Sequence, residues 1–138
     1  LNKTAKKFLV GEFSLTRLMT SLLLIPLFVY LGLLAFARFY ADKVIFQPQF
    51  SSYRDNENIL KLKTSDGQKI SARFYKNPDA AHTILFSHGN AEDIGDTDFL
   101  MRELQKNGFA VLAYDYRGYG TSEGTPSEEK VYRDADPA

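Results

Sequence analysis

A serine lies at the centre of the pattern G-x-S-x-G, at residues 120–124 within the stretch GYGTSEGTPSEE. In serine hydrolases this pattern places the nucleophile on a tight turn directly between a strand and the helix that follows. Ser122 lacks both neighbours, because the apolar run before it ends near Tyr114 and the next helix cannot begin before Pro126. We therefore predict that Ser122 is a polar residue of a loop and not a nucleophile.

The order of residues along the chain supports the same prediction. A large class of serine hydrolases carries its triad in the order Ser, Asp or Glu, and His, but His82 and His88 both precede Ser122 and no histidine follows it. Triads are recognised by geometry and not by chain order. The set His88, Asp115 and Ser122 therefore remains an alternative, since the first two residues would lie at the carboxyl ends of parallel strands.

Two other patterns could hold a cofactor or an ion. Three glycines follow a predicted strand, namely Gly118, Gly120 and Gly124. Their spacing departs from the G-x-G-x-x-G of dinucleotide-binding loops. Four acids surround the start of a predicted helix, namely Glu92, Asp93, Asp96 and Asp98. A solvated loop at the positive end of that helix explains these acids without a metal, and the chain has no cysteine. We expect no cofactor and no metal.

The elements that must position these residues begin with strands. Alternating residues at 59–63 and 70–75 flank an Asp-Gly turn, which predicts an antiparallel hairpin. Short apolar runs at 83–86 and 109–114 predict strands buried on both faces. Between them the apolar residues Phe99, Leu100, Met101 and Leu104 predict a helix over 96–107, which Gly108 ends. A strand, a helix and a strand in this order indicate a parallel crossover. Ser127 is expected to open a last helix.

Residues 18–37, LMTSLLLIPLFVYLGLLAFA, contain no charged side chain. About 20 apolar residues suffice for a helix to cross a membrane, and spanning helices tolerate a proline such as Pro26. We predict a transmembrane anchor over 18–38. Four basic residues precede it, Lys3, Lys6, Lys7 and Arg17, which predicts a cytoplasmic N-terminus and an extracytoplasmic body. Ala35-Phe36-Ala37 also fits a signal-peptidase site, so cleavage after Ala37 remains an alternative.

The chain thus divides into a basic cytoplasmic segment (1–17), the anchor (18–38), a connector (39–57) and a partial domain (58–138). Within the connector, VIFQPQF predicts a short edge strand ended by Pro48. Lys and Arg together number 17, and Asp and Glu together also number 17, so the formal net charge is zero. A chain without a basic stripe does not suit nucleic acid as a partner.

Two motifs in register behind the apolar segment carry a resemblance to a known family. SHGNAEDIG at 87–95 and YDYRGYGTSEGTPSEE at 114–129 resemble the single-pass, membrane-anchored α/β-hydrolase-domain proteins, whose animal relatives include depalmitoylating thioesterases. The resemblance implies an α/β fold, the amino-terminal part of an α/β-hydrolase, in which an antiparallel hairpin leads into a parallel sheet behind one transmembrane helix. It also implies a serine hydrolase that acts on an ester, thioester or amide, with a membrane and a small-molecule or acyl substrate as partners.

The resemblance also assigns roles to residues. In this family the loop after the third strand supplies one donor of the oxyanion hole, and the position in the motif points to the backbone N–H of Asn90, with Gly89 and Ala91 shaping the loop. His88 then belongs to this loop, while Asp115 and Arg117 brace the loop after the fourth strand. The triad is expected beyond residue 138, so the chain as given is expected to be truncated and inactive. The alternative is a non-catalytic, membrane-anchored remnant or interaction module.

Overall fold

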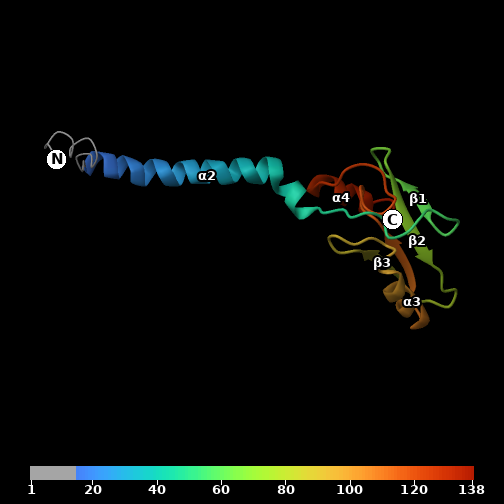
Figure 1. The fold of residues 1–138 in the computed structure, drawn as a ribbon. Helices are drawn as coiled ribbons and strands as arrows, with labels where there is room; N and C mark the ends of the chain where they lie inside the picture. The colour runs from blue at the N-terminus through green and yellow to red at the C-terminus, as the bar shows by residue number, and fades with distance from the viewer. Residues whose placement is uncertain (1–14) are drawn as a thin grey trace. The chain divides into compact units, whose positions relative to one another are not determined.

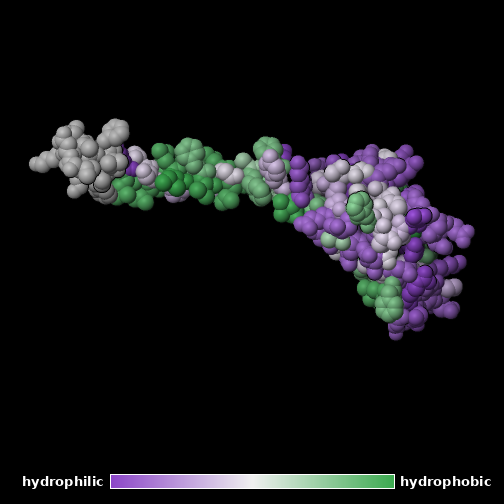
Figure 2. Space-filling view, viewed as in Figure 1, coloured by the Kyte–Doolittle hydropathy of each residue, from purple (hydrophilic) through white to green (hydrophobic). Residues whose placement is uncertain are grey.

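A computed structural model describes residues 15–138, which divide at Ala41/Asp42 into two compact units. Helix α2 (Leu15–Ile45) begins the described chain and contains Pro26. None of its residues is buried, and its surface is apolar along most of its length (Figure 2). The helix is long and apolar enough to span a membrane. Most of the predicted basic segment, 1–17, lies outside the described residues.

The connector differs from its prediction. Helix α2 continues to Ile45, and the residues after it form no strand, so the edge strand expected in VIFQPQF is wrong. The reason is local, because no glycine or proline interrupts the helix between Ala35 and Pro48. Pro48 disfavours helical geometry at the residue before it, and the last helical-type bond runs from the Phe46 N–H to the Asp42 carbonyl at 2.8 Å.

The strands of the second unit form one sheet with the order β1-β2-β4-β3 (Figure 1). Strands β1 (Leu60–Lys63) and β2 (Lys69–Tyr75) pair antiparallel, which confirms the predicted hairpin. Strand β2 also pairs antiparallel with β4 (Ala110–Tyr114), and β4 pairs parallel with β3 (Thr83–Ser87). The parallel pair confirms the predicted crossover.

Helix α3 (Asp98–Lys106) connects the two parallel strands and lies inside the predicted range of 96–107. Gly108 follows with a φ of 97°, as the predicted helix stop requires. The predicted apolar stripe is only half correct. Met101 is buried and Leu104 packs on the core, whereas Phe99 is 75% exposed. Residues three apart lie on the same face of a helix, but residues two apart do not. Phe99 therefore cannot lie on the core-facing side of α3 together with Met101. An apolar patch is visible over α3 (Figure 2).

Two clusters of buried residues cover the faces of the sheet. Ile94 and Met101 belong to a cluster with Val111 of β4, while Ala135 of helix α4 (Glu128–Ala135) packs on a cluster around Ile70 of β2. Strand β4 is buried along most of its length, as predicted. Strand β3 is not: Ile84 and Phe86 pack on the first cluster, whereas Leu85, which alternates to the other face, is 49% exposed. The prediction that both faces of β3 are buried is therefore wrong for the described chain.

Candidate active site

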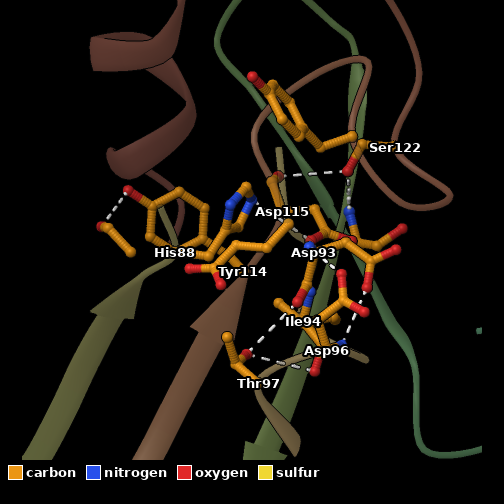
Figure 3. A network of polar contacts seen from close by, with 12 residues as sticks. His88, Asp93, Ile94, Asp96, Thr97, Tyr114, Asp115 and Ser122 are labelled. Atoms are coloured by element: carbon orange, nitrogen blue, oxygen red, sulfur yellow. Dashed lines mark hydrogen bonds and ion pairs between the residues drawn. The ribbon is translucent and has the colours of Figure 1, made fainter. Parts of the chain in front are cut away.

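Two titratable residues directly follow the parallel strands, and the sheet register brings them together. Ser87 and Tyr114 are paired at the ends of β3 and β4, so His88 and Asp115 leave the sheet side by side (Figure 3). The distance from His88 Nε2 to Asp115 Oδ1 is 3.4 Å, and both side chains are fully buried. His88 Nδ1 lies 2.8 Å from the Gly89 carbonyl. Burial lowers the pKa of His88, which favours the neutral imidazole.

The Asp115 carboxyl links three loops. Its Oδ1 accepts the Ile94 N–H at 2.8 Å, and its Oδ2 accepts the hydroxyl of Tyr53, which comes from the connector. The Tyr53 oxygen in turn accepts the N–H of Thr121 at 3.3 Å. Burial raises the pKa of Asp115 to about 7, although the hydrogen bonds from Tyr53 and Ile94 oppose that rise. This carboxyl is therefore a buried group that titrates near neutral pH.

The hydroxyl of Ser122 is committed to the main chain. Its oxygen accepts the Ser71 N–H at 2.8 Å and donates to the Asp115 carbonyl at 3.2 Å (Figure 3). The structure thus brings together two members of the alternative triad, His88 and Asp115, but the third bonds to backbone groups and not to His88. Ser122 acts here as a brace between β2 and the loop after β4.

Two ion pairs of Arg117, one buried and one partly exposed, hold the same loop. The Arg117 guanidinium donates to Asp134 of α4, with Nη2 at 2.6 Å from Oδ1, and to Asp66 of the hairpin turn, with Nη1 at 2.8 Å from Oδ2. Arg117 is 2% exposed and Asp134 is fully buried. The bonds from Arg117 lower the pKa of Asp66, and the two carboxylates raise the pKa of Arg117. The loop after β4 is therefore attached to both the hairpin and α4.

Several N–H groups of the glycine-rich loop are bonded within the fold. The N–H of Gly118 donates to the Glu123 carbonyl, the N–H of Ser122 to the Tyr119 carbonyl, and the N–H of Glu123 to the Lys69 carbonyl. Dinucleotide loops instead direct free N–H groups at the pyrophosphate. The dinucleotide alternative has no support in this geometry.

Of the four acids around the start of α3, Asp93 is buried instead of in contact with solvent as expected. Asp93 is only 4% exposed, and its carboxylate accepts the N–H groups of Ser52, Gly95 and Asp96. Burial would raise the pKa of Asp93, but these bonds and that of the Ser52 hydroxyl outweigh burial and lower it. Among residues 15–138 no group of acids and histidines is arranged to hold a metal.

The loop after β3 contains the predicted oxyanion residues. The Gly89 N–H donates to Glu92 Oε1 at 2.6 Å, and the Ala91 N–H donates to Asn90 Oδ1 at 3.0 Å. Ala91 has a φ of 62°, a left-handed conformation that an L-residue other than glycine seldom adopts. The loop borders a pocket of about 240 Å³, lined by Ile45, Phe46, His88, Gly89, Asn90, Tyr116, Tyr119 and Val131.

Comparison with known proteins finds similar sequences for this part of the chain. A family model described as serine aminopeptidase, S33, matches residues 78–136, from the turn before β3 to the last residues of the chain. The chain is 40% identical over 93 residues to alpha/beta hydrolase domain-containing protein 17B of Xenopus tropicalis, and 38% identical over 93 residues to the Homo sapiens protein of that name. The chain is therefore similar to proteins of the α/β-hydrolase domain family. Each alignment covers 65% of this chain and 32% of the relative, so the chain spans about a third of the length of the curated relatives it matches.

A solved structure has a similar fold. The esterase Pf2001 of Pyrococcus furiosus superposes with a TM-score of 0.54 at 22% identity, over 67% of this chain and 39% of that one. At this identity the likeness shows the fold alone. It confirms the predicted fold class, an α/β-hydrolase sheet with a hairpin leading into parallel strands.

Three site residues were missed by sequence reasoning. Tyr53 and Gln47 come from the connector, and Tyr119 comes from the glycine-rich loop, where it is 2% exposed. Only Tyr119 had a signal in the sequence, namely an aromatic residue between two glycines of a loop. The connector offered none, because its partners lie more than 40 residues away in the sequence.

Proposed function

We propose that the full-length protein is a serine hydrolase acting on an ester, thioester or amide, and that the backbone N–H of Asn90 is one donor of its oxyanion hole. One observation carries the assignment to Asn90. Of the three consecutive N–H groups at 89–91, those of Gly89 and Ala91 already have acceptors within the loop. The Asn90 N–H has no acceptor among the described residues.

The chemistry assigned to this N–H follows from charge development during acyl transfer. A serine oxygen attacks the substrate carbonyl, and the negative charge that forms on the carbonyl oxygen must be stabilised before the alcohol, thiol or amine leaves. A donor held in place before the reaction stabilises that charge without reorganisation. The loop at 89–91 is held in this way, because its neighbouring amides and the Asn90 side chain are all hydrogen-bonded.

We infer that the triad lies outside residues 15–138. Ser122 bonds to the main chain, and the order Ser, Asp or Glu, His of this fold has no match within the chain. That the curated relatives are about three times as long as the matched part supports this inference. The 138-residue chain is then inactive by itself and contributes the oxyanion loop and the first strands of the sheet.

The test removes single N–H groups from the full-length protein. Replacing residue 90 by the matching α-hydroxy acid converts its amide to an ester and deletes only the N–H, and the same change at residue 91 is the control. We expect kcat for a small ester or thioester to fall by roughly 10²–10³-fold for position 90 and far less for position 91. Equal losses would contradict the assignment to Asn90. A wild-type protein without hydrolysis or fluorophosphonate labelling would instead favour the non-catalytic remnant.

We also propose that α2 anchors the protein with its N-terminus in the cytoplasm and its hydrolase part outside. The apolar length of α2 and the four basic residues before the apolar stretch support this orientation. Protease added to intact cells or right-side-out vesicles should then digest an epitope at the carboxyl end and spare one at the amino end. The reverse protection pattern would overturn the orientation, and release of the body into the medium would favour cleavage after Ala37.

A further inference from the structure

The last residues of α2 and the segment after it are bound to the oxyanion loop through a single side chain. The carboxamide of Asn90 donates from Nδ2 to the Ile45 carbonyl, one of the carbonyls that the end of a helix leaves without an intrahelical partner. Its Oδ1 accepts the Gln47 N–H at 3.0 Å. All of these residues belong to the second compact unit, Asp42–Ala138.

Tyr119 completes this group of contacts. Its hydroxyl donates to Asn90 Oδ1 at 2.8 Å and accepts the Gln47 N–H at 2.9 Å. Its ring is buried and lies 5.1 Å from the ring of His88. The Asn90 carboxamide therefore connects the end of α2, the loop after β3 and the loop after β4. We call the contacts among Ile45, Gln47, Asn90 and Tyr119 the Asn90 clamp.

The clamp uses the side chain of Asn90 and leaves its backbone N–H available. Oδ1 accepts three N–H or O–H donors, counting the Ala91 N–H, and Nδ2 has a carbonyl acceptor. A carboxamide with these partners cannot rotate without losing several bonds. The orientation of the peptide unit at residue 90 therefore depends on contacts made by the end of α2.

Resting on the proposed function, we propose that Asn90 is a positioning residue as well as a backbone donor. Its side chain uses the end of α2 as a support that holds the Asn90 N–H in the geometry of the oxyanion hole. The end of the apolar helix is thus part of the construction of the active site. Ile45 and Phe46 also line the pocket beside Asn90, which places this segment in the wall of the site.

The test breaks the clamp from the side of α2 and leaves Asn90 unchanged. In the full-length protein in detergent, Gln47→Pro removes the N–H that bonds to Asn90 and Tyr119, whereas Gln47→Ala keeps this N–H and changes only the side chain. For a small soluble ester we expect Gln47→Pro to lower kcat by about tenfold to 100-fold with little change in KM, because the donor is misplaced. Gln47→Ala keeps the N–H but loses the exposed bond from its side chain to the Val44 carbonyl, so it should lower kcat far less than Gln47→Pro.

A second measurement separates the clamp from the reaction. Hydrogen exchange of a peptide covering residues 88–94 should be faster in Gln47→Pro and in Asn90→Ala than in Gln47→Ala, because both changes release the loop. Faster exchange with unchanged kcat would show a structural contact and overturn the positioning role. Unchanged exchange would overturn the clamp itself. If the wild type hydrolyses nothing, the proposed function fails, and with it the positioning role, while hydrogen exchange still decides the clamp.

Discussion

Gly120 is the position where one added methyl group should disturb the centre of the site most. It has a φ of 52°, and a Cβ at this position would overlap Asp115 Oδ2 and lie 2.7 Å from the Tyr53 hydroxyl oxygen. Asp115 cannot move away freely, since it is fully buried and also holds the Ile94 N–H. Gly120→Ala should therefore separate the Tyr53 hydroxyl from the carboxyl.

The expected loss of stability has two parts. An alanine in the left-handed region costs roughly 1–2 kcal/mol, and losing a hydrogen bond to a buried charged or titrating group costs about 1.5–3 kcal/mol. The sum is about 2.5–5 kcal/mol of unfolding free energy. Gly108 provides a matched control, because its φ is 97° and a Cβ there would have no other atom within 4 Å. Gly108→Ala should lose only the backbone part.

Both variants can be compared by pulse proteolysis in urea, with the protein in mild detergent. The difference between their unfolding free energies, about 1.5–3 kcal/mol, reports the crowding at Asp115. Tyr53→Phe removes the same hydrogen bond, so its cost should be smaller in the Gly120→Ala background than in the wild type. Equal losses for the two glycine variants, or full additivity with Tyr53→Phe, would refute the reasoning.

The other buried polar groups around the site lead to three more expected outcomes. Asp134→Asn should lower the unfolding free energy by about 3–5 kcal/mol, because it leaves the buried Arg117 charge poorly paired. The control Glu129→Gln breaks an exposed ion pair on the same helix and should change the urea midpoint of unfolding little. The folded-state pKa of Asp115, about 7, exceeds its ordinary value of about 3.9. The resulting stabilisation is complete at low pH and is lost as the pH rises through 7. When the pH is lowered from 8 to 5, the unfolding free energy of the wild type should therefore rise by on the order of 2–3 kcal/mol relative to that of Asp115→Asn. A difference in unfolding free energy that does not vary with pH would contradict this. Ser122→Ala should cost about 1–2 kcal/mol through its two lost backbone bonds and leave fluorophosphonate labelling of the full-length protein intact, and loss of labelling in a folded variant would restore Ser122 as a nucleophile.

The local elements were accessible from the sequence because their signals are local. The Asp-Gly turn, the alternation on either side of it and Gly108 specify backbone conformations within a few residues, and the structure contains the predicted hairpin and helix stop. The exposure of β3 was not accessible. It depends on which elements pack over each face of β3 in the described chain, and no pattern within residues 83–87 encodes that packing.

In the candidate site, too, the features that depend on neighbouring residues could be predicted and those that depend on distant residues could not. The α/β-hydrolase motifs, the loop that contains Asn90 and the absence of a strand-to-helix elbow at Ser122 could be predicted from residue spacing alone, because they depend on neighbouring residues. The partners of the buried polar groups could not be predicted in this way. Tyr53 meets Asp115 across 62 positions, and Arg117 meets Asp66 across 51. Such pairs form where the loops of distant elements converge at one edge of the sheet, and a buried charge or hydroxyl must find its partner there because water cannot reach it.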